Sequence, residues 1–530
     1  MLFQATAASA GSNRASALPV ASTAVGVSSR LPGPGAEDVM QYSSRVHDYL
    51  RELHEAHGDT VLLRRGGEDV VMVRGPEAIR RVLLDEDFAK TWDSDKTGSV
   101  EYVNNLVQPV LAGSIFSMHG QENFERRKLI RPAMTGSPVF MPSFVAVIED
   151  DVVGWADGVV DIQDLAHNLI RKTVITTLAG DEARSFAYTC IDTFHEVMEV
   201  SLHMRAAAAL VLVVLVVLVV LVVLLLLPAL LPLLTLALQY FVDRYSVVTT
   251  TPVVTEQDEV MMQKLKDAAL EVVVAFRGRF GCAVGCAASV AAMSDATRCS
   301  ILNVMMQVGT PDDELAATFV NVVIAAAEAP GSALAQLLEE LGSNPELQEK
   351  LRAVTAAAPA GGAELVAFVE QNEYVKKVVL EGLRRFAPAT IVQRAAVTDT
   401  EIGGVKIAKG QVVVMCPHAI HMDAQQFPEP EKFDEERSGN VHTRLGKEQS
   451  FMTFSGGQRG CPGRHLALSM MLAACVVLPR QFEFYAAPRD SKGRDADFRR
   501  GMETKGASRV PKFVEWQVDG IPLGMRRRTR

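Results

Sequence analysis

The 530-residue sequence has few cysteines, few aromatic residues and no excess of basic charge. Its 7 cysteines stand at irregular spacing, which excludes a disulfide framework and is typical of thiols in a reducing compartment. The 53 Lys and Arg against 63 Asp and Glu give a net charge of −10, and this balance excludes non-specific nucleic-acid binding, which needs a basic face. With 48% hydrophobic and 22% charged residues, a disordered or collagen-like chain is excluded as well.

The first 36 residues lack acidic side chains. They carry Arg14 and Arg30, are rich in Ala, Ser, Val and Thr, and contain no apolar stretch long enough for a signal anchor. This composition is typical of an organelle transit peptide, and a disordered tail is the alternative. We therefore expect residues 1–36 to lie outside the fold, and we favour a plastid or mitochondrion over the endoplasmic reticulum as the location.

Residues 206–242 lack charged side chains altogether, and Leu alternates there with Val pairs in a three-residue repeat. By length the tract could span a bilayer, for which about 20 apolar residues suffice. A single span would separate the two halves of the chain, however, and the site described below needs both. We therefore predict a membrane-dipping insertion, either a segment that enters one leaflet or a hairpin bent at Pro228 and Pro232. A low-complexity insertion without a role, or an error in the sequence, is the alternative.

Hydrophobic periodicity predicts a fold that is mainly α with a small β part. The predicted helices cover residues 76–84, 121–135, 145–158, 164–178, 182–204, 310–341 and 366–386, with a further helix after Cys461. The predicted strands cover residues 61–64, 70–74, 390–397 and 411–415. Gly66 and Gly67 separate the first two strands, which indicates a β-hairpin.

The most informative stretch is 454–463, where a glycine-rich loop carries Cys461 to the start of an apolar helix. Backbone N–H groups at a helix start stabilise a thiolate, and a thiolate suits a soft or redox-active metal such as haem iron. Gly457 and Gly463 permit a tight turn and the close approach of a flat cofactor. Arg459 offers a permanent cation to a carboxylate on that cofactor. A lone cysteine can equally be an inert buried thiol.

This stretch resembles the haem-binding loop of the cytochrome P450 family, Phe-x-x-Gly-x-Arg-x-Cys-x-Gly. All five fixed positions match, and they are Phe454, Gly457, Arg459, Cys461 and Gly463. The resemblance implies a haem b cofactor with Cys461 as the axial thiolate ligand of the iron. It covers about residues 31–520 and implies a single cytochrome P450-like domain over residues 37–520, interrupted by the 206–242 insertion and followed by a basic tail at 521–530.

Further motifs resemble the family in order and spacing. Glu381 and Arg384 match its Glu-x-x-Arg, and Arg437 lies in the segment that supplies the third member of that ion network. Arg394 stands where the family places a haem-propionate ligand. A second propionate contact is implied on the helix near residue 125, where Phe124 replaces the usual Trp and Lys128 the usual Arg. Lys keeps the charge but loses the bidentate fork of Arg.

The predicted long helix departs from the family pattern beside the haem. Glu328 aligns with the family's acid, which makes it the implied catalytic residue, but Ala329 replaces the Thr whose hydroxyl helps to deliver protons during oxygen activation. A bound water or Glu328 itself would have to serve instead. Pro330 follows, and it is expected to bend the helix.

Three functions follow from the resemblance. The first is a haem-thiolate monooxygenase that inserts one oxygen atom from dioxygen into a lipophilic substrate, with electrons from an NADPH-dependent reductase or a ferredoxin. The second, favoured by Ala329, is an isomerase or dehydratase acting on a hydroperoxide without external electrons. The third is a non-enzymatic haem-binding member.

The resemblance also implies two surfaces. An acidic electron donor would dock on a basic cluster at the cysteine side, although a solvated basic face is the alternative. That cluster consists of Arg126, Arg127, Lys128 and Arg131. The apolar insertion falls where the family has the lid that touches membrane, so we expect a membrane-associated protein.

Overall fold

Helices make up most of the described chain and a small β part completes it, so the predicted fold class is confirmed. The computed structural model describes residues 46–65, 68–89, 114–115, 118, 120–135, 137–181, 256–280, 293–389, 391–437, 451–487 and 521–528. The α-helices are α1 (Val46–His57), α2 (Pro76–Leu84), α5 (Gly120–Thr135), α6 (Ser137–Asp151), α7 (Ile162–Ala179), α10 (Glu256–Phe280), α12 (Asp295–Cys299), α13 (Ile301–Gln307), α14 (Asp312–Ser343), α15 (Pro345–Ala356), α16 (Gly362–Gln371), α17 (Glu373–Arg385), α18 (Pro417–His421) and α20 (Arg464–Gln481). The strands are β1 (Thr60–Arg65), β2 (Glu68–Val73), β3 (Phe88–Ala89), β4 (Gly158–Asp161), β5 (Val392–Ala396), β6 (Thr400–Ile402), β7 (Val405–Ile407), β8 (Val412–Met415), β9 (Phe482–Ala486) and β10 (Pro522–Arg527).

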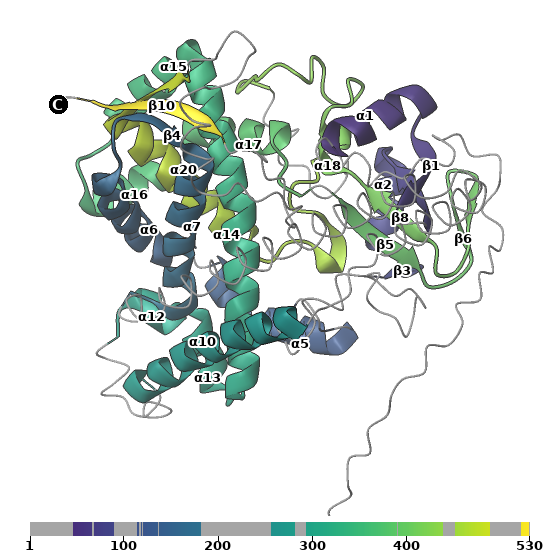
Figure 1. Ribbon diagram of the computed structural model, residues 1–530, viewed down its shortest axis with the longest axis horizontal. Helices are drawn as coiled ribbons and strands as arrows, with labels where there is room; N and C mark the ends of the chain where they lie inside the picture. The colour runs from purple at the N-terminus through teal and green to yellow at the C-terminus, as the bar shows by residue number, and fades with distance from the viewer. Residues whose placement is uncertain are drawn as a thin grey trace, which may run out of the picture.

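The long helix α14 lies between the group of α6, α7, α16 and α20 on one side and the main sheet on the other (Figure 1). Its first turn carries Asp312, Asp313 and Glu314, whose charges are favourable at the positive end of a helix. Most of the following side chains are apolar and buried against α7, α10, α17 and α20, so hydrophobic burial holds α14 in place. Pro330 lies inside this helix, which continues to Ser343.

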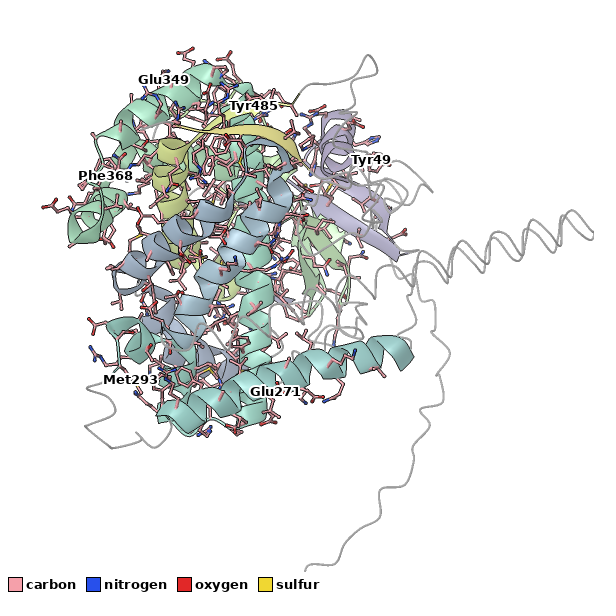
Figure 2. The ribbon with its side chains drawn as sticks, turned by 60° about the vertical axis from the view of Figure 1, so that its left-hand side comes forward. Tyr49, Glu271, Met293, Glu349, Phe368 and Tyr485 are labelled. Carbon is pink, nitrogen blue, oxygen red and sulfur yellow. The ribbon has the colours of Figure 1, made fainter. Side chains whose placement is uncertain are left out.

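The two ends of the helical part are distinguished by the labelled residues of Figure 2. Glu271 on α10 and Met293 lie at one end, whereas Glu349 on α15 and Tyr485 on β9 lie at the other. Helix α14 contacts both α10 and β9, and it therefore connects these ends through the core.

The main sheet lies beside the helical part and has the strand order β1-β2-β8-β5-β3 (Figure 1). Strands β1 and β2 are antiparallel, as the predicted hairpin requires, and β2 pairs with β8 in parallel. Two separate apolar clusters line the sheet; α1 contributes to one and α2 to the other, while α18 contributes Ala419 to the first and Ile420 to the second. In β5, Arg394 pairs in register with Val413 of β8, which fixes the position of a predicted site residue.

One predicted helix is in fact two. Residues 366–386 were expected to form a single helix, but α16 ends at Gln371 and α17 begins at Glu373. Asn372 separates them, and its side-chain oxygen accepts a 2.9 Å hydrogen bond from the Val375 N–H at the start of α17. Asn is a favourable N-cap because its side chain satisfies a backbone donor that has no partner within the helix.

The predicted basic tail at 521–530 was wrong over most of its length, because residues 522–527 form strand β10 between β4 and β9. Leu523 and Met525 are buried, which shows the alternation of a strand with one face toward the core. The Oδ1 of Asp161 accepts a hydrogen bond from the Ile521 N–H at 3.1 Å and so ties the strand to the start of α7. The folded domain therefore extends beyond the predicted boundary at residue 520.

The predictions for residues 1–36, 182–204 and 206–242 lie outside the described residues. Within the described residues, α14 passes a test of length and hydropathy for a membrane span. However, 78% of its most apolar 18-residue window is buried inside the protein, as expected for a core helix.

Candidate active site

The cysteine loop is closed by its own backbone. The Ser455 N–H donates to the Met452 carbonyl at 2.8 Å, and the Cys461 N–H donates to the Phe454 carbonyl at 2.9 Å. A single 3₁₀ turn at Gly457–Arg459 lies between these bonds, and α20 begins at Arg464. The loop therefore holds Cys461 immediately before the N-terminus of an 18-residue helix, as the sequence predicts.

The two glycines predicted to admit a cofactor differ in their surroundings. Gly457 has φ +68°, and a Cβ there would lie 2.2 Å from the Leu83 carbonyl oxygen of α2, so its close approach is to the protein itself. Gly463 has φ −87°, and a Cβ there would meet nothing closer than Met134 Sδ at 3.9 Å. Packing within the described protein therefore requires glycine at 457 but leaves open space beside 463, where a flat cofactor could lie.

The Cys461 thiol is exposed, although protein atoms lie around it on many sides. This surrounding protein desolvates the thiolate and raises the pKa of Cys461 above its usual value. Three groups act in the opposite direction: the Gly463 N–H, the Arg127 guanidinium and the Arg464 guanidinium. The site thus combines an accessible sulfur with donors and cations that favour its ionised form.

Positively charged groups gather beside this sulfur, and among the described residues no carboxylate pairs with Arg127 or Arg464. Nε of Arg127 and Nε of Arg464 are buried and have no hydrogen-bond partner among the described residues. Arg394 is only 5% exposed, and burial lowers its pKa to about 10, with a further lowering from Arg127. Arg459 donates to the Met118 carbonyl at 3.0 Å. Buried guanidinium groups are costly unless an anion pairs with them, so this cluster suits an anionic ligand.

Helix α5 presents a different face to the loop from the one predicted. Phe124 is 60% exposed and Lys128 is exposed, so the structure does not bring either residue to Cys461. The buried Asn123 and the half-buried Arg127 lie one position earlier, and Arg127 Nη1 donates to the Gly460 carbonyl at 2.8 Å. The sequence analysis assigned Arg127 to the docking cluster and not to the cysteine site. Phe124 is the only aromatic residue of this helix, and aligning it with the family's Trp placed the predicted contact at Lys128, one residue too late.

Helix α14 has a short strip of alanines that the rest of the described protein does not cover. Ala325 is the single exposed residue between Leu315 and Glu340, a span described in full, and its neighbours Ala326 and Ala329 are half-buried. Because these positions lie on one side of a helix, they form an uncovered strip on a helix that is otherwise enclosed. Ala329 presents no hydroxyl there.

The predicted catalytic acid Glu328 is held by helix α7. Its Oε1 accepts a 2.8 Å hydrogen bond from Arg171 Nη2, and its Oε2 lies 3.5 Å from His167 Nδ1. All three side chains are buried. A Cβ at Gly331 would lie 2.9 Å from the His167 ring, so glycine at this position lets α7 approach α14 closely.

The predicted ion network is present and completely enclosed. Glu381 and Arg384 form a bidentate pair at 2.9 and 2.8 Å, with both side chains at 0% exposure. Arg437 Nε donates to Glu381 at 3.2 Å, and the Asp434 N–H donates to the same carboxylate at 3.1 Å. Both guanidinium groups also donate to backbone carbonyls of residues 428–432. The network therefore joins α17 to the segment that precedes the cysteine loop.

The fold and the site together define a helical protein organised around an accessible cysteine, with guanidinium groups beside it. A cytochrome P450 family model matches residues 32–156 and 239–505. The chain therefore belongs to the cytochrome P450 family.

Two curated relatives illustrate the match. Cyclooctat-9-en-7-ol 5-monooxygenase of Streptomyces melanosporofaciens is 23% identical over 453 residues, which is 82% of this chain and 84% of that protein. Cytochrome P450 3A29 of Sus scrofa is 34% identical over 174 residues, but this match spans only 35% of the pig protein. Family membership and the named monooxygenase support an enzyme of the oxidoreductase class.

Solved structures share the fold. The retinoic-acid-bound cyanobacterial CYP120A1 superposes with a TM-score of 0.66 at 16% identity, over 94% of this chain and 98% of that one. The haem domain of cytochrome P450DA matches with the same TM-score and identity. At this identity the likeness shows the fold alone.

Proposed function

We propose that the protein is a haem-thiolate monooxygenase, which inserts one oxygen atom from dioxygen into a lipophilic substrate with electrons from a redox partner. The observation that carries this proposal is the accessible Cys461 thiol beside the half-buried guanidinium groups of Arg127 and Arg464. Haem b fits both the thiol and the guanidinium groups, because its iron takes a thiolate ligand and its propionates are anions that pair with cations. When bound, haem would supply the redox chemistry of dioxygen.

The described residues fit this cofactor. Cys461 would ligate the iron, and the open space beside Gly463 would admit the edge of the macrocycle. Arg127, Arg394 and Arg459 would pair with the propionates, since each is a permanent cation on this side of the molecule. Phe454 is buried and lies under the Arg464 guanidinium at 5.6 Å, which would fix one wall of the loop. Lys128 would take no part, because it is exposed on the outer face of α5.

Proton delivery would rest on Glu328. Ala329 has no hydroxyl, so a proton would have to reach the substrate side through Glu328 and water. The ion pair with Arg171 holds the Glu328 carboxylate on the α7 side of α14, so this route requires the carboxylate to turn from Arg171 or to act through a bridging water.

The same alanine supports a second candidate function, that of an isomerase or dehydratase of a hydroperoxide. Such a substrate brings its own O–O bond and needs no proton relay. Turnover of a fatty-acid hydroperoxide and of a lipophilic hydrocarbon should be compared with and without NADPH and a reductase or ferredoxin. Product that requires the donor and dioxygen supports the monooxygenase. Product from the hydroperoxide alone supports the isomerase, and no turnover of either kind supports a non-enzymatic haem-binding role.

The electron donor would dock on the outer face of α5. The predicted cluster of four cations is divided by the structure, because Arg126 pairs with Glu314 and Arg127 with the Gly460 carbonyl. Lys128 and Arg131 stay exposed on the face that also presents Phe124. Opposite charges on a donor would be steered toward this face.

Reversing these two charges should slow reduction. In the double variant Lys128→Glu, Arg131→Glu we expect the reduction rate at low salt to fall about tenfold and its salt dependence to flatten, because steering is electrostatic. Stopped-flow reduction by the donor at several salt concentrations measures both. The matched control is Lys350→Glu, Arg352→Glu on α15, which changes the net charge equally at the far end of the molecule (Figure 1). Equal slowing in both variants would contradict a docking role for α5.

A lipophilic substrate and a membrane surface remain part of the proposal. The alanine strip on α14 offers only apolar contacts, and the Streptomyces relative is named for an apolar cyclic alcohol. Membrane association rests on the predicted insertion at 206–242, and the organelle address on residues 1–36. The relatives come from animals and a bacterium, and they do not favour an organelle.

A further inference from the structure

The C-terminal end of α17 is capped by side chains from two other segments. The last carbonyls of a helix have no partner within the helix, so other donors must satisfy them. The Leu383 carbonyl accepts a 2.8 Å hydrogen bond from Thr453 Oγ1, and the Arg384 carbonyl lies 3.0 Å from His421 Nδ1. Thr453 directly precedes Phe454 of the cysteine loop, so this cap joins the loop to the helix that carries Glu381 and Arg384.

The second ring nitrogen of His421 extends this connection. Its Nε2 lies 2.8 Å from the Met452 backbone nitrogen. A backbone N–H can only donate and a carbonyl can only accept, so Nε2 must carry the lone pair and Nδ1 the hydrogen. The partners therefore determine one neutral tautomer.

The His421 ring is also held in place by packing. It is 0% exposed, it stacks on Phe451 at 5.3 Å and 16°, and it meets the edge of Phe427 at 5.8 Å and 75°. Full burial with both nitrogens bonded is the environment of a residue that positions other groups.

A continuous series of bonds then leads from the ion network to the thiol. Arg384 Nη1 donates to the His421 carbonyl at 2.9 Å, and the His421 ring accepts from Met452. The Met452 carbonyl accepts from Ser455, and the Phe454 carbonyl accepts from the Cys461 N–H. Each of these hydrogen bonds is 2.8 or 2.9 Å long, and the last one reaches the Cys461 backbone, so a change at His421 acts on the base of the loop.

We infer that His421 is a positioning residue for Cys461. It holds the segment before the loop at a fixed distance from the end of α17, and it thereby keeps the thiol in the orientation needed to ligate the cofactor. The part of this inference that concerns the iron rests on the proposed haem-thiolate function.

The test replaces His421 with Phe, which preserves ring stacking on Phe451 but removes both hydrogen bonds. Removing a buried hydrogen-bond partner leaves the Met452 N–H and the Arg384 carbonyl unsatisfied. We expect amide exchange in the peptide 451–455 of the full-length protein to become about tenfold faster, and the thiolate-type fraction of the reduced carbon monoxide complex to fall about fivefold. His421→Gln, which can keep one of the two bonds, should fall between this variant and the natural protein.

A matched control separates positioning from general stability. Val369→Ala on α16 removes apolar bulk at a fully buried position that belongs to another part of the core. The inference holds if Val369→Ala is destabilised as much as His421→Phe but keeps the thiolate fraction of the natural protein and its slow amide exchange in residues 451–455. Equal changes in both variants, or an unchanged thiolate fraction and unchanged exchange in His421→Phe, would overturn it. A natural protein without a thiolate band would refute the haem proposal, while the exchange measurement would still decide the role of His421.

Discussion

The Cys461→Ser variant is expected to lose the thiolate-type Soret band of the reduced carbon monoxide complex, with an amplitude reduced about tenfold or more. Cys461 is the thiol that lies accessible beside Arg127 and Arg464 at the start of α20. Serine keeps the size of the side chain, but its harder and more basic oxygen is a poor substitute for a thiolate on iron. The measurement is the carbon monoxide difference spectrum of reduced natural and variant proteins, prepared at equal concentration.

Cys299→Ser is the matched control for this experiment. Cys299 is a half-buried free thiol at the end of α12, and its replacement should leave the band unchanged. A thiolate band that persists in Cys461→Ser would show that another group binds the iron. If the natural protein has no haem signal at all, the cysteine loop does not bind haem and a non-enzymatic function becomes the better proposal.

Glu381→Gln is expected to lower the free energy of unfolding by about 3–5 kcal/mol, because it removes the negative charge from a buried network that contains two guanidinium groups. Arg384 and Arg437 would then keep their positive charges in the interior with backbone carbonyls as partners. Natural domains have only about 5–15 kcal/mol of total stability, so the variant should retain little folded protein near physiological temperature. Urea unfolding followed by far-UV circular dichroism measures the change.

The exposed pair of Lys377 and Glu436 supplies the control for Glu381→Gln. Its two atoms lie 2.6 Å apart, but the side chains are 40% and 62% exposed, so Glu436→Gln should cost less than about 1 kcal/mol. Should Glu381→Gln fail to accumulate, Glu381→Asp keeps the charge at a shorter reach and should be destabilised less. Equal effects at positions 381 and 436 would contradict a special role for the buried network.

Local patterns of the sequence were sufficient for the cysteine loop and for the Glu381–Arg384 pair of the ion network. Phe454, Gly457, Arg459, Cys461 and Gly463 lie within ten residues, so chain connectivity alone brings them together. Glu381 and Arg384 are three residues apart on one helix, and that spacing puts them on one face. The structure places all of these residues as a contiguous loop and a bidentate pair.

Helix α5 shows where local pattern was insufficient. Every residue near Phe124 is polar or charged over two turns, so periodicity did not determine which side faces the protein. Packing against α13 and α20 determines which side of α5 faces the protein. Asn123 and Arg127 face inward, whereas Phe124 and Lys128 face the solvent. The predicted basic tail failed for a similar reason, since only pairing with β4 and β9 makes residues 522–527 a strand.

By itself, the sequence determined the family, the mainly helical fold, the cysteine loop and the Glu381–Arg384 pair, because each depends on residues close in the chain or on strong apolar periodicity. Tertiary structure alone decided which guanidinium groups lie beside Cys461, that Glu328 pairs with Arg171, and that His421 joins α17 to the base of the loop. These contacts connect residues 31 to 333 positions apart. They form only when burial of the core brings distant elements together, and no local pattern encodes that pairing.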